Sequence, residues 1–359
     1  MEYINEKIEL SHTLQGNFYH SEEVLNIVKT KVFEKSWQYI DSDCDFKINK
    51  YAKPFIFLEK FITEPLFLIK NNNKIDCFSN VCTHRGNILI DTPRIVKGNI
   101  LCGYHGKQFD SCGIFKFMPK TEGMLNFPSN FDNLSSINID KWRKFIFVSL
   151  DPIIPLNLLI KEMSSRISWL PIDDFKFRKD LSKEYTIDAN WALYCDNYLE
   201  GFHIPFIHKD LNEALDYDKY DVEIFKYSNL QLGFGTNNND CFIIPEKSKD
   251  YGKNIAAYYF WLFPNMMFNF YPWGLSINIV KPIAATKTKV EFLTYVWKEE
   301  KMNVGAGADI NKVELEDEEI VQRVQNGVKS RYYKHGRFSP LMEKGVHHFH
   351  LLIKQFMLK

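Results

Sequence analysis

The chain has 359 residues, of which 45% are hydrophobic and 25% are charged, a composition typical of a globular protein long enough for two domains. Its formal net charge is zero and no apolar run is long enough to span a bilayer, so we expect neither a nucleic-acid nor a membrane partner. Seven scattered cysteines and a glutamate-rich N-terminus without an apolar core favour reduced thiols and a cytoplasmic location over a disulfide framework or a targeting peptide.

The first half of the chain predicts one helix followed by a small β domain. Ser21 and the two glutamates after it are typical of a helix start, and this helix is expected over residues 21–33. Short apolar segments separated by turns follow within residues 46–155, which predicts a small antiparallel β domain. Its expected strands are residues 54–59, 66–70, 75–79 and 144–150.

The second half mixes helices with strands. Helices are expected at residues 158–166 and 188–200, and a helix or helix pair is expected from about residue 311 to 329 and from 341 to the C-terminus. This mixture, with the β domain before it, predicts the α+β class. The expected strands are residues 222–225, 257–262, 275–282 and 290–297.

Two cysteine–histidine pairs lie on loops of the β domain, namely Cys82-Thr83-His84 and Cys102-Gly103-Tyr104-His105. A Rieske [2Fe–2S] centre needs this ligand set, because two thiolates hold one iron and two imidazoles hold the other. Both spacings and the neighbouring glycines agree with the pattern C-x-H…C-x-x-H, so these two cysteines and two histidines are the candidate cluster ligands. The alternative is a structural zinc site with the same four ligands.

A second group of metal-binding residue types lies between Asp196 and His208. On a helix, Asp196, Glu200 and His203 would share one face, because they are four and three residues apart. Pro205 would end or kink that helix and let the chain return His208 toward His203. Two such histidines and one carboxylate can form the facial triad of a non-haem ferrous ion, which leaves coordination positions open. The alternative is that the two histidines are unrelated.

These motifs resemble those of the large subunit of Rieske non-haem iron oxygenases. Residues 82–86 resemble the family's C-x-H-R-G motif, residues 102–110 its C-x-Y-H-G-x-x-F-D motif, and residues 190–208 its mononuclear iron signature. Residues 195–199 and 333–350 resemble the branch that acts on quaternary ammonium compounds, such as choline and carnitine monooxygenases.

The resemblance implies a Rieske domain of residues 46–155 and a helix-grip (START-like) catalytic domain of residues 1–45 plus 156–359. It also implies a [2Fe–2S] cluster, a mononuclear Fe(II) held by His203 and His208, and a homotrimer. In that trimer Glu200 would carry electrons from the cluster of one subunit to His203 of the next. Asp196 would contact an iron ligand rather than the iron itself. The electrons would come from NAD(P)H and flavin through a separate reductase, because the chain shows no nucleotide-binding motif.

The resemblance also implies that the third iron ligand lies on the late helix. The family takes it from an acidic residue, often in an E-D pair before a Q-x-G segment, and Glu316-Asp317 precedes Gln325-Asn326-Gly327 in this chain. Asp317 is the preferred candidate, because its short side chain loses less conformational freedom on binding. Glu316 and Glu319 remain alternatives.

One position departs from the family pattern. The family often has tryptophan after the Y-H-G of the second Rieske motif, and this chain has Lys107 there. A cation at this position could raise the potential of the cluster, help an electron donor dock, or simply be solvated. Cys112, five residues further on, is expected to be a free thiol.

Three functions fit these motifs. The favoured one is a monooxygenase of a small quaternary amine, whose charge an aromatic cage would bind. The alternative is a ring-hydroxylating dioxygenase or O-demethylating oxygenase of an aromatic compound. A Rieske electron carrier is least favoured, because it has no use for His203 and His208. The candidate cage residues, for which burial in strand cores is the alternative, are Tyr258, Trp261, Phe263, Phe268, Phe270, Tyr271 and Trp273.

Overall fold

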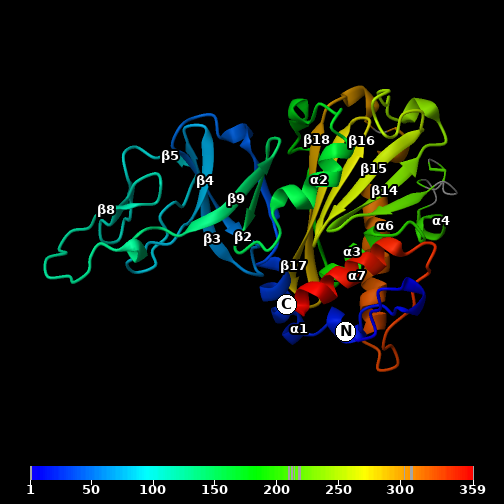
Figure 1. Ribbon diagram of the computed structural model, residues 1–359, viewed down its shortest axis with the longest axis horizontal. Coiled ribbons are helices and arrows are strands. Elements are labelled where there is room, and N and C mark those ends of the chain that lie inside the picture. Colours follow the sequence, from blue (N-terminus) through cyan, green and yellow to red (C-terminus); the bar gives the residue numbers. More distant parts are fainter. Residues whose placement is uncertain are drawn as a thin grey trace. The chain divides into compact units, whose positions relative to one another are not determined.

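The computed structural model describes every residue except 1, 209, 210, 212, 214, 217–219, 303, 308, 309 and 359, and only the backbone of residues 310 and 311. The chain forms two compact units, one of Trp37–Ile153 and one that joins Met1–Ser36 to Ile154–Lys359 (Figure 1). The smaller unit contains both cysteine–histidine pairs, and the larger unit contains His203, His208 and Asp317.

The smaller unit is built on a seven-stranded antiparallel sheet of order β1-β10-β9-β4-β3-β2-β5, with a separate three-stranded sheet β6-β7-β8. The predicted start of this domain at residue 46 is too late, because β1 pairs with β10. This strand carries aspartate and serine at its end, so its apolar run is too short to predict it. The strands are β1 (Gln38–Ser42), β2 (Tyr51–Phe57), β3 (Glu64–Asn71), β4 (Lys74–Ser79), β5 (Arg94–Ile95), β6 (Ile100–Leu101), β7 (Gln108–Phe109), β8 (Phe115–Phe117), β9 (Ser136–Trp142) and β10 (Phe145–Ser149).

The larger unit is built on an eight-stranded antiparallel sheet of order β11-β18-β17-β16-β15-β14-β13, with β12 also paired to β18. The strands expected at residues 222–225, 257–262, 275–282 and 290–297 are present, with ends that differ by a few residues. The strands are β11 (Lys176–Phe177), β12 (Lys183–Ile187), β13 (Asp221–Ile224), β14 (Ser228–Phe234), β15 (Ile255–Leu262), β16 (Met266–Tyr271), β17 (Gly274–Ala284) and β18 (Lys287–Val296).

The centre of this sheet has one polar and one apolar face. Gln231, Tyr259, Asn269 and Ser276 lie opposite one another on β14, β15, β16 and β17, and successive side chains on a strand point to opposite faces. The next residues along the strands form the other face, and they are apolar or aromatic and buried. They include Leu230, Tyr258, Phe260, Phe268, Phe270 and Ile277.

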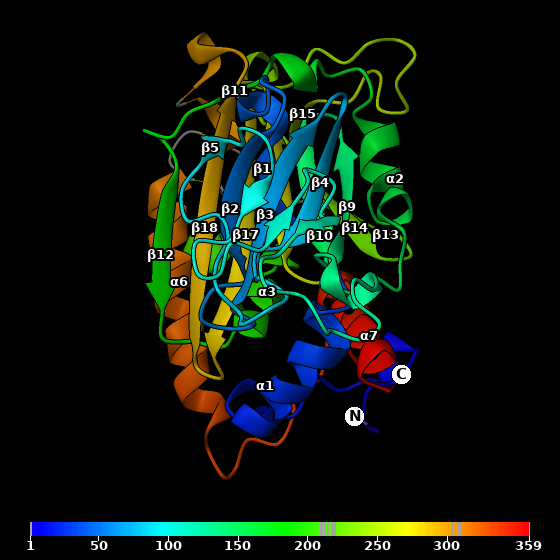
Figure 2. The same ribbon diagram turned by 90° about the vertical axis from the view of Figure 1, so that its left-hand side faces the viewer.

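Helices cover this sheet from both sides (Figure 2). Helix α2 contacts β14 and β15, whereas α3 contacts β17 and also α6 and α7. The α-helices are α1 (Glu22–Val28), α2 (Leu156–Arg166), α3 (Trp191–Tyr198), α4 (Ile204–Ile207), α6 (Ile310–Val328) and α7 (Lys344–Met357). Shorter turns are η1 (Ile8–Leu10), η2 (Gly16–Tyr19), the π-helical η3 (Lys29–Phe33), η4 (Asp43–Asp45), η5 (Asn130–Asp132), η6 (Ile172–Asp174), η8 (Asn238–Asp240), η9 (Glu299–Lys301) and η10 (Gly305–Gly307).

The helix ends follow local sequence signals. The hydroxyl of Ser21 accepts a hydrogen bond from the Val24 N–H, as expected of the predicted N-cap. Asn190 caps α3 in the same way, so this helix starts later than residue 188. It also ends earlier than predicted, at Tyr198. Among the described residues, no helix has the length and apolarity that crossing a bilayer requires.

Candidate metal centres

The two cysteine–histidine loops of the smaller unit have the same backbone turn. In each loop the cysteine N–H donates to the carbonyl five residues later, at 2.8 Å in both, and the glycine four residues later donates back to the cysteine carbonyl. Those glycines, Gly86 and Gly106, have φ angles of 71° and 72°, which favour glycine. The first loop has its histidine two residues after Cys82 and the second three residues after Cys102, yet the turns are alike.

The four candidate ligands lie in two environments. Both thiols are buried and free, whereas both imidazoles are exposed, with ring centroids 4.7 Å apart. A [2Fe–2S] cluster with thiolates on one iron and imidazoles on the other uses two such environments, so the donor set fits this cluster better than a single zinc ion.

Local hydrogen bonds favour the thiolate form of Cys102. Burial acts to raise the pKa of this thiol, but hydrogen bonds from the Tyr104 N–H, the Cys82 thiol, the His105 N–H and the Asn87 amide outweigh burial and hold its pKa below its ordinary value. The Asn87 Nδ2 lies 3.7 Å from the Cys102 sulfur. Thiolate is the form that binds iron, so this loop is arranged for a metal ligand.

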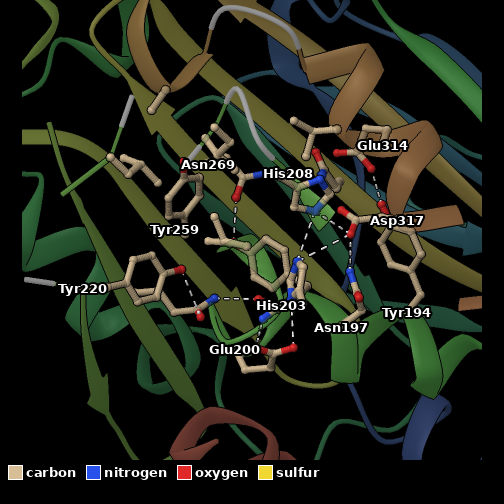
Figure 3. A pocket seen from close by; sticks show the side chains of 18 of the residues that line it. Tyr194, Asn197, Glu200, His203, His208, Tyr220, Tyr259, Asn269, Glu314 and Asp317 are labelled. Atoms are coloured by element: carbon tan, nitrogen blue, oxygen red, sulfur yellow. Dashed lines mark hydrogen bonds and ion pairs between the residues drawn. The ribbon is translucent and has the colours of Figure 1, made fainter. Parts of the chain in front are cut away.

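In the larger unit, His203, His208 and Asp317 meet at one point (Figure 3). His203 is the N-cap of the short helix α4 and His208 its C-cap, while Asp317 lies on α6. The two Nε2 atoms are 3.2 Å apart, and Asp317 Oδ1 is 2.9 Å from His208 Nε2 and 3.6 Å from His203 Nε2. Two imidazoles and a carboxylate that converge in this way are the donor set of a non-haem iron, so the residues fit that metal.

Two further carboxylates hold the other ring nitrogens of these histidines. Glu200 Oε1 is 2.8 Å from His203 Nδ1, and Glu316 Oε2 is 2.7 Å from His208 Nδ1. A carboxylate at Nδ1 fixes the tautomer whose Nε2 lone pair is free for a metal. Glu316, an alternative third ligand, therefore lies behind His208, while Glu319 is exposed and binds Arg323.

Acidic groups also shape the electrostatics here. Burial acts to lower the pKa of His208, but its bonds to Asp317 and Glu316 prevail and raise that pKa to about 8. Glu314 is buried, and its burial and the nearby charge of Asp317 raise its pKa to about 8. Tyr194 donates its hydroxyl to Glu314, and Asn197 donates its amide to Asp317 at 2.6 Å.

The expected helix face of Asp196, Glu200 and His203 is wrong, because α3 ends at Tyr198. Asp196 stays on α3, where Oδ2 accepts from the Tyr19 hydroxyl at 2.8 Å and Oδ1 is 2.8 Å from His350 Nε2. It still lines one cavity together with Glu200 and His203, although the three do not share a helix. Glu200 and His203 instead come together through the turn that follows the helix. Asp196 thus binds the N-terminal and C-terminal segments.

The pocket beside the three converging residues is lined by tyrosines, amides and carboxylates and also by aliphatic side chains, namely Ile204, Leu211, Leu215, Ala306 and Val313. Of the predicted cage residues only Tyr271 lines it, because Tyr258, Phe268 and Phe270 point to the apolar face of the sheet. The alternation along β15 and β16 selects Tyr259 and Asn269 for the pocket, because it divides the aromatic run between the two faces of the sheet. The tyrosines that line the pocket are Tyr194, Tyr198, Tyr220, Tyr259 and Tyr271.

Lys107 is neither solvated nor placed on the surface for a docking partner. Its side chain is buried, and its Nζ binds Asp132 Oδ1 at 2.9 Å. Cys112 is exposed and free, as predicted.

Two family models match the chain. The model described as "Ring hydroxylating alpha subunit (catalytic domain)" matches residues 174–359, and the model described as "Rieske [2Fe-2S] domain" matches residues 36–128. The second range contains both cysteine–histidine loops, and the first contains the three residues that meet beside the pocket.

Similar proteins cover almost the whole chain. Chloroplastic choline monooxygenase of Arabidopsis thaliana is 28% identical over 366 residues, which cover 96% of this chain and 83% of that protein. The carnitine monooxygenase oxygenase subunit of Escherichia coli (strain K12) is 27% identical and covers 96% and 93%.

Solved structures share the fold. A quaternary ammonium Rieske monooxygenase in complex with L-carnitine has a TM-score of 0.76 at 22% identity, covering 97% of this chain and 96% of that chain. Naphthalene 1,2-dioxygenase with bound indole has a TM-score of 0.73 at 15% identity, covering 100% and 95%. The predicted fold class, a Rieske domain with an α+β catalytic domain, is confirmed.

Proposed function

This chain belongs to the family of ring-hydroxylating alpha subunits and carries a Rieske domain, and from that premise we propose that it oxidises a small quaternary amine with O₂. As a member of this family it is a Rieske oxygenase with a [2Fe–2S] cluster and a mononuclear iron, and it takes electrons from a partner reductase. We assign the cluster to Cys82, His84, Cys102 and His105, and the iron to His203, His208 and Asp317.

The observation that carries the choice of substrate is the charge of the pocket. Glu200 and Asp317 line it together with five tyrosines, whereas none of its described lining residues is lysine or arginine. Glu314 also lines the pocket, but its pKa of about 8 leaves it mostly uncharged at neutral pH. Tyrosine faces and carboxylates both attract a cation. Aliphatic side chains also line the pocket, so its charge, and not its polarity, is what supports the amine over the aromatic alternative.

The residues of this chain prepare the site for that reaction. Glu200 and Glu316 orient the two imidazoles, and the tyrosines exclude water from an alkylammonium group. The iron, when bound, supplies the reduction of O₂. One oxygen atom enters a C–H bond beside the nitrogen and the other leaves as water, which consumes two electrons and two protons. A hydroxyl next to a quaternary nitrogen is an unstable hemiaminal, which releases an aldehyde and a tertiary amine.

Substrate-dependent oxygen uptake tests this proposal. The holoenzyme with a surrogate reductase is given choline, carnitine and betaine, and in parallel naphthalene. The matched control is 3,3-dimethylbutan-1-ol, which replaces the nitrogen of choline by carbon and removes only the charge. We expect aldehyde or hydroxylated product from an amine and none from the neutral analogue. A diol from naphthalene, with no product from any amine, would instead establish the aromatic alternative.

Neighbouring residues on β15 give a second test of the pocket. Tyr259→Leu removes an aromatic face from the pocket, so KM for the amine should rise about tenfold while the cluster spectrum stays unchanged. Phe260→Leu changes the next residue, which points to the apolar face, and should lower stability without raising KM. Equal KM values in both variants would argue against a cation at Tyr259.

For electron delivery we infer a homotrimer in which Glu200 links the cluster of one subunit to His203 of the next. The support is that Glu200 binds His203 through two contacts, its Oε1 at Nδ1 and its Oε2 at the His203 N–H, 3.1 Å away. One similar structure is described as revealing insights into inter-subunit electron transfer.

All seven cysteines are free, which suits a reducing compartment, and we infer that the protein is located in the cytoplasm.

Glu200→Gln tests this link directly. The variant keeps a hydrogen-bonding side chain but loses the charge, so single-turnover oxidation of the cluster should slow by about tenfold or more. The rate is measured with iron at saturation and per bound iron, because loss of the carboxylate at His203 Nδ1 also weakens iron binding. An unchanged single-turnover rate would show that electrons take another route.

A further inference from the structure

One residue of the smaller unit, Asp132, ties the two cluster loops together. Its carboxylate Oδ1 binds Lys107 Nζ at 2.9 Å, and its backbone carbonyl accepts from the Thr83 hydroxyl at 2.8 Å. Thr83 lies between Cys82 and His84 in the first loop, and Lys107 lies two residues after His105 in the second. Asp132 therefore fixes the separation of the loops that carry the candidate ligands.

Lys107 is an unusual member of this connection because its charge is buried. The residue is 1% exposed, and its Nζ lies 5.3 to 5.8 Å from the ring centroids of Phe109, Phe115 and Phe127. Its backbone carbonyl also accepts from the Cys102 N–H at 2.8 Å, within the turn of the second loop. Aromatic faces and one carboxylate thus replace the water that a lysine ammonium normally keeps.

An ion pair with a buried lysine is a costly way to join two loops. Apolar side chains of similar volume often stabilise a protein as well or better, because the ammonium group of Lys107 must be desolvated while Asp132 is only partly buried. Residues that only closed the gap between the loops would not need charge. What the pair adds is a fixed cation two residues after His105 and a fixed anion on the residue that is bonded to Thr83.

We propose that Lys107 and Asp132 are positioning residues that hold the cluster loops together and set the reduction potential of the Rieske cluster. The cluster gains one electron on reduction, so a cation nearby stabilises the reduced state and an anion destabilises it. Lys107 lies two residues after His105, and its partner Asp132 is bonded to Thr83 between Cys82 and His84, so the ammonium group is held against both loops. Low exposure limits screening of this charge by solvent.

Two single-charge variants test the proposal because they should shift the potential in opposite directions. Lys107→Met removes the cation and should lower the midpoint potential, whereas Asp132→Asn removes the anion and should raise it. We expect each equilibrium constant for one-electron reduction to change about tenfold, which corresponds to about 59 mV. The double variant should return toward the potential of the wild type. The measurement is a spectroelectrochemical titration of the holoenzyme.

Three controls separate charge from structure. Lys141→Met removes the same charge from an exposed ion pair with Asp43 in the same unit and should leave the potential unchanged. Lys107→Arg keeps the charge and should stay closer to the wild type than Lys107→Met. The electron-spin resonance g-values and the content of iron and labile sulfide report whether the cluster itself is intact.

The sign of the shifts decides the outcome. A pair that only holds the loops together would reduce cluster content or melting temperature in both variants, with shifts of the same sign or none, and that result overturns the assignment. If Lys107→Met does not retain its cluster, Asp132→Asn still decides the question, because an unchanged or lower potential in that variant contradicts the proposal. These readouts do not depend on which substrate the enzyme oxidises.

Discussion

Each histidine beside the pocket has one ring nitrogen at the shared point and the other at a carboxylate. The Glu316–His208 contact of 2.7 Å fixes the orientation of an imidazole whose own exposure is 1%. Glu316→Gln should therefore weaken iron binding by about ten- to a hundredfold without removing a ligand. Iron titration of the apoprotein measures this, with Glu319→Gln as the control, since Glu319 is exposed on the same helix. Equal affinities in the two variants would contradict a role for Glu316.

His203→Ala separates the two metal centres. The wild type should contain roughly three irons and two labile sulfides per chain, and the variant roughly two irons and two sulfides. The electron-spin resonance signal of the reduced cluster should persist, because His203 belongs to the other unit, while substrate oxidation should be lost. A variant that still turns over, or a wild type that holds zinc in place of iron, would show that these assignments are wrong.

At the scale of single residues, the sequence predicted the candidate metal ligands better than the residues that orient those ligands. The cysteine–histidine pairs are predictable because both spacings are local, and His203 with His208 because five residues separate them. Glu200 was expected at His203, three residues away, whereas the contacts of Glu316 and Asn197 depend on how α6 packs against α3 and the turn after it. Asp196 shows the limit, because a helical spacing was assumed across residues where the helix has already ended.

At the scale of elements, α7 starts directly against the end of α3. A Cβ added to Gly345 would lie 2.3 Å from the Leu199 carbonyl oxygen. A backbone oxygen, unlike a side chain, cannot relieve this overlap by changing its rotamer. Gly345→Ala should therefore cost about 1–3 kcal/mol of stability and displace Glu200, the residue after Leu199. Melting temperature and iron content measure both effects. Gly327→Ala on α6 is the control, because its Cβ meets no atom within 4 Å, and it should be neutral or slightly stabilising.

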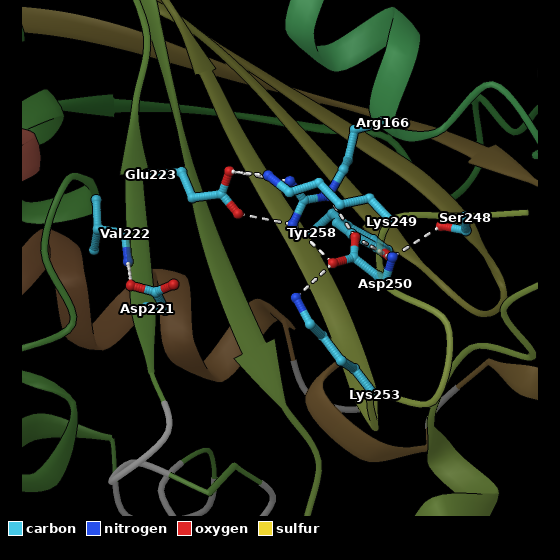
Figure 4. Close-up of polar contacts among 9 residues, drawn as sticks. All are labelled: Arg166, Asp221, Val222, Glu223, Ser248, Lys249, Asp250, Lys253 and Tyr258. Carbon is cyan, nitrogen blue, oxygen red and sulfur yellow. Dashed lines mark hydrogen bonds and ion pairs between the residues drawn. The ribbon is translucent and has the colours of Figure 1, made fainter.

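A buried ion network anchors α2 to the sheet (Figure 4). Arg166 binds Glu223 of β13 through two contacts of 2.8 and 3.0 Å and also binds Asp250, which accepts in addition from Tyr258 and Lys253. Burial acts to raise the pKa values of both acids, but the bonds from Arg166 prevail and lower them. Their stabilisation is therefore present above the pKa values of the unfolded chain and is lost as the pH falls below them.

Arg166→Met tests this network through its pH dependence. At pH 7 the variant should lose about 3–5 kcal/mol of its free energy of unfolding, because two carboxylates lose their buried partner. The difference from the wild type should narrow as the pH falls from about 5 toward 3, where the carboxylates become protonated. Urea unfolding at a series of pH values measures it. A constant difference would mean that Arg166 contributes through packing alone.

Most long elements could be predicted from the sequence, and the short ones could not. β15, β17 and β18 are apolar over enough residues to be recognised, whereas β5 to β8 have two or three residues and exist only through pairing. β16 is not among the predicted strands, because its run of aromatic residues also fits a cation-binding cage. Its register with β15 divides those residues between the pocket and the core, and a pattern along one strand does not show this division.

At the scale of the whole molecule, the inferred trimer predicts that two inactive variants restore each other. Cys82→Ser should lose the cluster but keep the iron, and His203→Ala should lose the iron but keep the cluster. Each homotrimer is inactive. In trimers mixed at equal amounts, half the subunits retain iron and half of those have a donor neighbour with a cluster, so about a quarter of the wild-type activity should return. Electron transfer within one chain would return none, because no single chain then contains both centres. Activity after co-expression, with wild-type subunits diluted into either variant as the calibration, distinguishes the two routes.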